Sequence, residues 1–244
     1  RDRVMNIAIH YCQDDRTAAP RLRSPRQVWA VATRLRRQLP AAGTGMQDGR
    51  ALMAAVRHVV GNGRAIEIVW DGDHDVHDED GKPVFGVCET DPDNPGVAYV
   101  SVNGPLLRDR PDILASTIAH ELGHVVFDVP GVQRRYRSVT AATSLHAGER
   151  ASEWRANEFM GALLVPAFEL HRELLRLAAG EGLRLARAAH HGRPGCPVVD
   201  GRSNADALAG VMAALAGRFG VSDSFIDMRL RRYGLITNGM EICR

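Results

Sequence analysis

Lysine is nearly absent from this sequence of 244 residues. Lys82 is the only lysine, so arginine supplies almost all of the positive charge, and the formal net charge is only +2 at pH 7. An arginine-rich composition set among many Ala and Gly residues more often reflects a GC-rich bacterial genome than a nucleic-acid surface. The charge therefore gives little indication of DNA binding.

Cysteine is scarce as well, and the four thiols lie far apart in the chain. They are Cys12, Cys88, Cys196 and Cys243. They form no Cys-x-x-Cys pair for zinc or redox chemistry, and their density is too low for a disulfide-stapled secreted domain. We expect unpaired thiols in a reducing compartment.

Long apolar runs are missing too. No stretch of about 18 apolar residues is available to span a membrane. The first 25 residues are polar and Arg-rich, and they lack the apolar core of a signal peptide. We expect a cytoplasmic protein without a membrane partner, and the start at Arg1 leaves open a leader that was removed.

The remaining composition is that of a globular protein, with 45% hydrophobic residues. Apolar spacing and Gly or Pro boundaries predict helices at 25–40, 51–60, 111–129, 149–165, 167–189, 204–219 and 222–233, and strands at 65–70, 84–88 and 97–103. We expect an α+β fold with a small antiparallel sheet and a C-terminal helix-turn-helix-like segment. The expected divisions are an N-terminal segment (1–24), a catalytic domain (25–189), a loop or insertion (190–203) and a helical segment (204–244).

The stretch TIAHELGHVVFD contains the pattern His-Glu-x-x-His at His120, Glu121 and His124. Residues four apart on a helix lie one above the other, so the two imidazoles can bind one metal ion. Glu121 then flanks the position of an attacking water molecule and can serve as general base. Catalytic zinc usually takes three protein ligands, so a third donor has to come from elsewhere in the chain.

A metzincin would supply that donor as a histidine in the extended pattern HExxHxxGxxH, but Phe127 and Pro130 occupy the Gly and His positions. The following predicted helix offers Glu149, Glu153 and Asn157, which share one face because they are spaced by four. Glu153 with Asn157 is close to the Glu-x-x-x-Asp arrangement of gluzincins, in which the Glu binds zinc and the later residue hydrogen-bonds a ligand histidine. Glu149 remains the alternative third ligand.

The sequence resembles the ImmA/IrrE-type metallopeptidases, which carry HELGH followed by a helix of the form ExxANxFAxxLLxP. This chain has HELGH at 120–124 and EWRANEFMGALLVP at 153–166, and the similarity resumes at 215–236. The resemblance covers about residues 97–236. It implies zinc bound by His120, His124 and Glu153, and Glu121 as general base.

The same resemblance implies a protein substrate, namely a helix-turn-helix transcriptional repressor of stress-response or mobile-element genes. The strand at 97–103 is a candidate edge for an extended substrate. Candidates for a second oxyanion donor are Tyr136, His146, His190 and His191.

Two other readings compete with the protease. The helices at 204–233 have the outline of a DNA-binding helix-turn-helix, with Arg229, Arg231 and Arg232 available for phosphates. A sensor on an inactive peptidase scaffold is disfavoured because the base and all proposed ligands are present. The acidic stretch at 71–82 fails as a calcium loop, since Val76 replaces the turn Gly and Lys82 the bidentate Glu.

Overall fold

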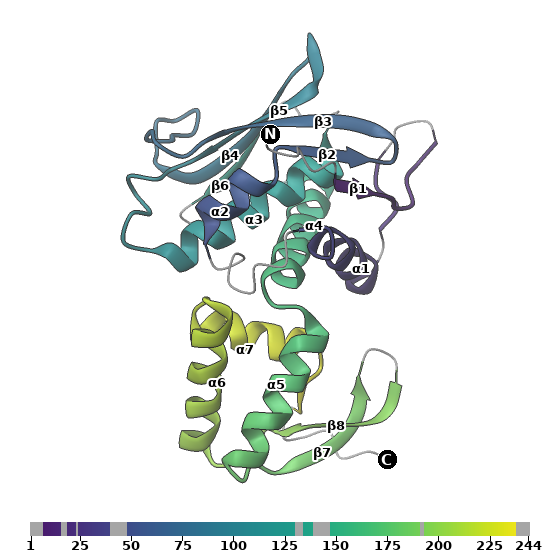
Figure 1. Cartoon of the computed structure of the whole chain (residues 1–244), viewed down its shortest axis with the longest axis vertical. Coiled ribbons are helices and arrows are strands. Elements are labelled where there is room, and N and C mark those ends of the chain that lie inside the picture. The colour runs from purple at the N-terminus through teal and green to yellow at the C-terminus, as the bar shows by residue number, and fades with distance from the viewer. Residues whose placement is uncertain are drawn as a thin grey trace. The chain divides into compact units, whose positions relative to one another are not determined.

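The computed structural model in Figure 1 describes residues 7–15, 19–22, 24–39, 48–129, 134–138, 147–190 and 193–237. These residues form two compact units, Arg1–Leu164 (unit 1) and Val165–Arg244 (unit 2). Helices and strands are both abundant, so the expected α+β class is confirmed. Within the described ranges, no helix is long and apolar enough to cross a membrane.

Unit 1 contains a six-stranded sheet with the strand order β1-β2-β3-β5-β4-β6. The strands are β1 Ile7–Ile9, β2 His58–Gly61, β3 Arg64–Asp71, β4 Val84–Asp91, β5 Asn94–Val102 and β6 Arg134–Ser138. β1 with β2 and β3 with β5 are parallel pairs, so the sheet is mixed rather than antiparallel as predicted. β5 lies between β3 and β4 and has both edges paired, so it cannot offer a free edge to a substrate.

Four helices accompany this sheet: α1 Pro25–Arg36, α2 Gly49–Ala55, α3 Pro111–Asp128 and α4 Ala147–Leu164. The helix predicted at 51–60 is too long, because the chain leaves α2 after Ala55 and enters β2 at His58. In β2 the apolar Val59 pairs with Ile66 of β3, a contact that helical periodicity does not reveal.

α3 is the central helix of unit 1. Pro111 stands at its first position, and every residue from Ala115 to Phe127 is buried. A helix buried all round has packing partners on every side. α3 contacts α4, α2 and strands β2, β4 and β5, and Figure 1 shows it lying against the sheet. Its polar residues are therefore held within the core of the unit.

The described residues of unit 2 form three helices and a three-stranded sheet of order β7-β8-β9. The elements are α5 Ala167–Gly180, β7 Leu185–His190, β8 Arg193–Asp200, α6 Ala205–Phe219, α7 Asp223–Arg232 and β9 Ile236–Thr237. α5 is shorter than the predicted helix at 167–189, and Gly182 follows it with a positive φ of 62°. Much of the predicted loop at 190–203 is strand β8, paired with β7. The predicted helices at 204–219 and 222–233 are confirmed.

Candidate metal centre

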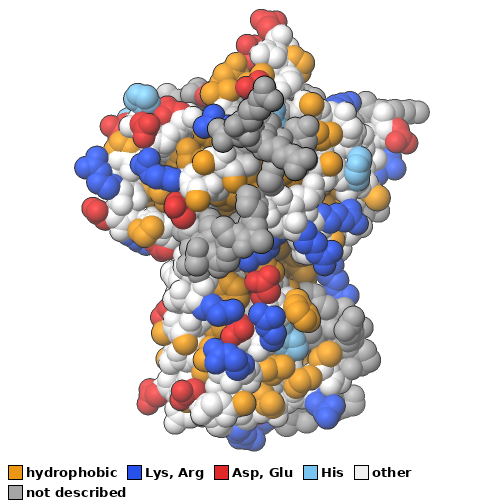
Figure 2. Space-filling view, in the orientation of Figure 1, with side chains coloured by type: hydrophobic (Ala, Val, Ile, Leu, Met, Phe, Trp, Pro, Cys, Tyr) orange, Lys and Arg blue, Asp and Glu red, His pale blue; other side chains and the backbone are white. Residues whose placement is uncertain are grey.

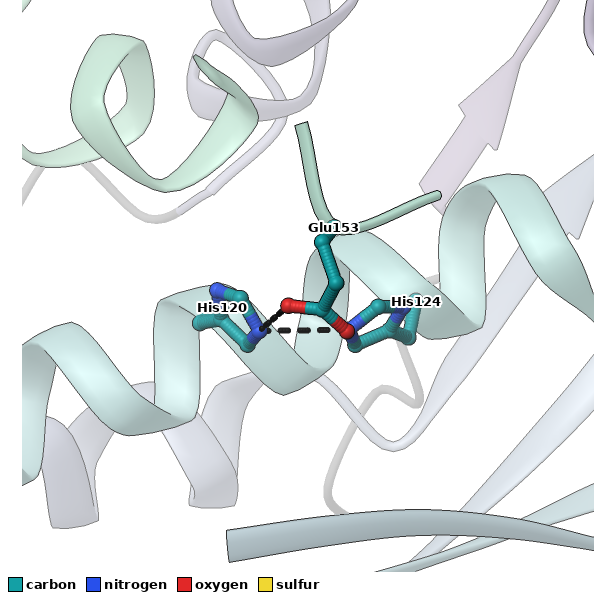
Figure 3. Close-up of side chains that lie close together, drawn as sticks. All are labelled: His120, His124 and Glu153. Atoms are coloured by element: carbon teal, nitrogen blue, oxygen red, sulfur yellow. Dashed lines mark hydrogen bonds and ion pairs between the residues drawn. The ribbon is translucent and has the colours of Figure 1, made fainter. Parts of the chain in front are cut away.

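Helices α3 and α4 bring three potential metal ligands together. His120 and His124 project from one side of α3, and Glu153 of α4 reaches between them (Figure 3). The two histidine Nε2 atoms are 3.1 Å apart. A Glu153 carboxylate oxygen lies 3.3 Å from the Nε2 of His120, and the other lies 3.2 Å from that of His124. Among the described residues, this is the one group of three or more His, Cys, Asp or Glu side chains close enough to share an ion.

The spacing of these atoms fits a small tetrahedral ion. Ligand atoms about 2.0–2.1 Å from a common ion are about 3.3 Å apart at the tetrahedral angle. The three observed separations lie between 3.1 and 3.3 Å. Two imidazoles and one carboxylate are also a frequent donor set of catalytic zinc, with a fourth position left for water or substrate. The donor types and the spacing of the three residues therefore fit such an ion.

The charges of the group are strongly coupled. Burial alone would lower the pKa of His124, but hydrogen bonds with Asp128 and Glu153 raise it to about 10. Burial acts in the opposite direction on Glu153, whose pKa nevertheless falls below its ordinary range because His120 and His124 donate hydrogen bonds to it. The histidines are buried, whereas 23% of the Glu153 side chain is exposed, so the group is reached from the Glu153 side.

A buried carboxylate at the end of α3 also contacts this group. Asp128 follows His124 by about one helical turn, and its Oδ2 atom lies 2.9 Å from the Nδ1 atom of His124. Burial opposes ionisation of Asp128, but His124, Arg155 and Ser152 hold its pKa below the usual range. Asp128 was not predicted from the sequence, although its spacing of four from His124 places both residues on one helix face.

The candidate general base, Glu121, lies on α3 directly after His120 and is fully buried. On strand β4, a Cβ atom at Gly86 would be 3.1 Å from Glu121 Oε1 and 2.8 Å from Thr117 Cγ2. Because position 86 has no side chain, the backbone of β4 can lie against the carboxylate. The negative charge of Glu121 also contributes to the raised pKa of His124.

Two residues of α4 that the sequence suggested for the site, Asn157 and Glu149, are not part of the three-residue group. Asn157 is exposed, and its amide donates to the backbone carbonyl of Glu153 at 2.8 Å, so it does not hold a ligand histidine as predicted. The prediction was wrong because α4 is rotated so that Ser152 and Arg155, rather than Asn157, face the end of α3. Glu149, the alternative ligand, is not in the three-residue group.

The family model of Peptidase_M78, described as the IrrE N-terminal-like domain, matches residues 108–231. The chain belongs to this family. The match agrees with the resemblance to ImmA/IrrE-type metallopeptidases seen over residues 97–236, and it includes the three potential ligands and Glu121. Membership in the IrrE N-terminal-like family supports a metallopeptidase-like function and a protein substrate. A search of curated proteins finds no match to the chain.

The IrrE N-terminal-like match extends through α5, α6 and α7 of unit 2. On α7, Arg229 is buried, with its guanidinium 5.7 Å from the ring centroid of Phe225 and 5.8 Å from that of Tyr233. It is therefore not available to a phosphate as predicted. Arg231 forms an ion pair with Asp227 on the same helix. On the face shown in Figure 2, positive and negative side chains of unit 2 are mixed.

The other residues named from the sequence lie away from this group or outside the described part. The side chains of the four oxyanion candidates, Tyr136, His146, His190 and His191, and the whole of Cys243 are outside the described residues. Cys12, Cys88 and Cys196 form no disulfide. The stretch at 71–82 leads from the end of β3 towards β4. In it, Asp71 Oδ2 lies 2.9 Å from His74 Nδ1, and Lys82 Nζ lies 3.2 Å from Asp80 Oδ2.

Proposed function

We propose that the protein is a zinc-dependent endopeptidase in which His120, His124 and Glu153 bind the ion and Glu121 is the general base. The observation that carries this proposal is the group of ligand atoms, in which the two histidine Nε2 atoms lie 3.1 Å apart and each lies 3.2–3.3 Å from one of the two Glu153 oxygens. Glu121 is buried next to the histidines on α3. The alternative ligand Glu149 is set aside because it lies outside this group. Membership in a metallopeptidase family supports the same assignment.

In the proposed peptide hydrolysis, His120, His124 and Glu153 hold the metal ion and Glu121 transfers the proton. A zinc ion bound by this group would supply Lewis-acid chemistry, making water acidic near neutral pH and polarising the scissile carbonyl. Glu121 accepts a proton from the attacking water and returns it to the leaving amine. Gly86 of β4 borders the space of this carboxylate, since a Cβ atom there would lie 3.1 Å from Glu121 Oε1. A base that is held in one position lowers the entropic part of the barrier.

We propose a regulatory protein as the substrate, specifically a helix-turn-helix transcriptional repressor, cut in the cytoplasm during stress or mobile-element induction. The support is the likeness of residues 97–236 to ImmA/IrrE-type peptidases. Such a substrate would have to approach the proposed metal site from the side of Glu153, where the site is exposed.

The test compares the wild type with Glu121→Gln in the native host by proteomics of new peptide termini, with metal analysis of both purified proteins. We expect about one zinc ion per chain in both proteins, and a cleaved regulator only with the wild type. Glutamine keeps the shape of the side chain but cannot take the proton, so the rate should fall by roughly 10²–10⁴-fold. A wild-type protein that retains no zinc, or identical peptide termini in both strains, would refute the proposal.

The rival function, a DNA-binding or sensor module on the same scaffold, has weaker support. α6 and α7 do form a helix pair, but Arg229 is buried and Arg231 is paired with Asp227. A gel shift of host DNA that is equal for the wild type and Glu121→Gln would favour the module.

A further inference from the structure

The carboxylate of Asp128 joins the two helices that carry the potential metal ligands. Asp128 is the last residue of α3, and only 5% of its side chain is exposed. Its Oδ2 atom receives a hydrogen bond from Ser152 Oγ at 2.5 Å, and its Oδ1 atom one from Arg155 Nη2 at 2.7 Å. Both donors lie on α4, on either side of Glu153 in the sequence.

The contact with His124 fixes the side of the imidazole that faces a metal ion. The Nδ1 atom of His124 lies 2.9 Å from Asp128, and the Nε2 atom lies 3.2 Å from Glu153. With its Nδ1 proton held by the carboxylate, His124 presents Nε2 to a metal ion, and the orientation of its ring is fixed as well. Asp128 thus determines that His124 directs its Nε2 atom towards His120 and Glu153.

The contacts with α4 fix the helix that supplies the third ligand. A buried carboxylate is stable only where charged or hydrogen-bonding partners compensate for lost water. Arg155, with 12% of its side chain exposed, and Ser152 provide this compensation, and both must keep facing the end of α3 to do so. Because α4 behaves as a rigid element, holding residues 152 and 155 also fixes the direction of Glu153.

We propose that Asp128 is a positioning residue that orients both His124 and Glu153 for metal binding. It orients His124 directly, and it orients Glu153 through its hydrogen bonds with Ser152 and Arg155 of α4. The inference rests on the proposed metal site. It replaces Asn157 of the sequence analysis with a residue whose contacts reach both helices. Asp128 itself binds no ion and takes no proton in the reaction.

The decisive experiment measures zinc affinity by competition with a chromophoric chelator for the wild type, Asp128→Asn and Ser152→Ala, and records Co²⁺ absorption spectra of each. Asparagine keeps the size of the side chain but not its charge, so we expect zinc affinity to fall by about 10- to 100-fold. We also expect altered Co²⁺ d–d bands. Ser152→Ala removes one contact and should weaken binding by about 3- to 10-fold. It serves as the milder variant if Asp128→Asn folds poorly.

Glu158→Gln is the matched control, because Glu158 is a buried carboxylate of α4 that accepts a hydrogen bond from Trp29 Nε1 of α1 at 2.7 Å. It should lower thermal stability of the metal-free protein but leave zinc affinity and Co²⁺ bands unchanged. Equal zinc affinity in the wild type, Asp128→Asn and Ser152→Ala, or an equal loss in Glu158→Gln, would overturn the positioning role while leaving the metal site intact. A wild type that binds no zinc would overturn both proposals.

Discussion

Gly123 on α3 lies directly against Ala156 on α4, so that a Cβ atom at position 123 would be only 2.9 Å from the Ala156 Cα atom. This close approach lets Glu153, less than one helical turn before Ala156, reach the histidines on either side of Gly123. The glycine is therefore a condition for bringing His120, His124 and Glu153 together, although it is not one of the proposed ligands.

We predict that Gly123→Ala destabilises unit 1, because the added methyl group meets backbone rather than a flexible side chain, and such overpacking costs about 1–3 kcal/mol. The helix propensity of alanine offsets up to about 1 kcal/mol of this cost, so the expected net loss is up to about 2 kcal/mol. Trp29, Trp70 and Trp154 are the only tryptophans of the chain and all lie in unit 1, so fluorescence during urea unfolding reports on it.

The control for this substitution is Gly148→Ala on α4, where a Cβ atom would have no neighbour within 4 Å. Its stability should equal that of the wild type or exceed it by up to about 1 kcal/mol, because alanine adds helix propensity without meeting a neighbour. A Gly123→Ala protein as stable as Gly148→Ala would show that α3 and α4 can separate without cost.

Glu149 and Glu153 of α4 give a second prediction, because substituting each in turn separates the proposed third ligand from its alternative. Glu153→Ala removes an oxygen 3.2 Å from His124 Nε2 and should weaken zinc binding by at least about 100-fold, since a two-histidine site lacks the third anchor. Glu149→Ala should bind zinc as the wild type does. Isothermal titration with zinc at fixed pH measures both, and full affinity in Glu153→Ala would reject the ligand assignment.

Local sequence signals were sufficient for α3 and for naming His120, His124 and Glu153, the three side chains that the structure brings together. Pro111 and Pro130 bracket the motif helix in the sequence, and α3 spans Pro111–Asp128. Spacing by four also placed Glu149, Glu153 and Asn157 on one face, but it could not tell how α4 is rotated against α3. That rotation depends on Asp128 and on Gly123, which are contacts between helices rather than properties of either helix.

The sheets were predicted less well because their pairing is non-local. The apolar run around Val59 continues the spacing of α2, so the start of β2 at His58 is visible only through its pairing with β1 and β3. Residues 185–190 are rich in Ala and Arg, which favour helices, yet they pair with β8. Local propensity gives way to tertiary contacts at both places.

Gly86 of β4 leads to a third prediction, which concerns rate rather than metal binding. A methyl group there would lie 2.8 Å from Thr117 Cγ2 and 3.1 Å from Glu121 Oε1, so the base must move. We expect Gly86→Ala to lower kcat by roughly 10- to 100-fold, since small displacements of a base are costly, while zinc affinity is retained. Gly96→Ala on β5 is the control, because its nearest neighbour is 3.8 Å away. Equal kcat for both variants would argue against a fixed Glu121.

Tyr11 provides the last prediction, which concerns alkaline stability. Its hydroxyl donates a hydrogen bond to the Val126 carbonyl of α3 at 2.6 Å, and its ring packs edge-on against Phe127. Burial and, next, the negative charge of Asp128 raise the pKa of Tyr11 to about 12. The phenol ionises near pH 10 in the unfolded chain. The folded state therefore keeps a proton that the unfolded state loses, and stability contributed by Tyr11 is complete below pH 10 and is lost as the pH rises towards 12.

We expect Tyr11→Phe to be about 1 kcal/mol less stable than the wild type at pH 8, because the hydrogen bond to Val126 is lost. Between pH 10 and 12 this difference in the free energy of unfolding should shrink by about 2 kcal/mol and change sign. The reason is that only the wild type has a phenol at position 11 that stays protonated in the folded state and ionises in the unfolded state. Urea unfolding followed by tryptophan fluorescence across this range measures the effect. Tyr99→Phe, an exposed site on β5 with 38% of the residue accessible, should follow the wild type throughout. Parallel curves for the wild type and Tyr11→Phe would mean that the Tyr11 hydroxyl is not held against α3 in solution.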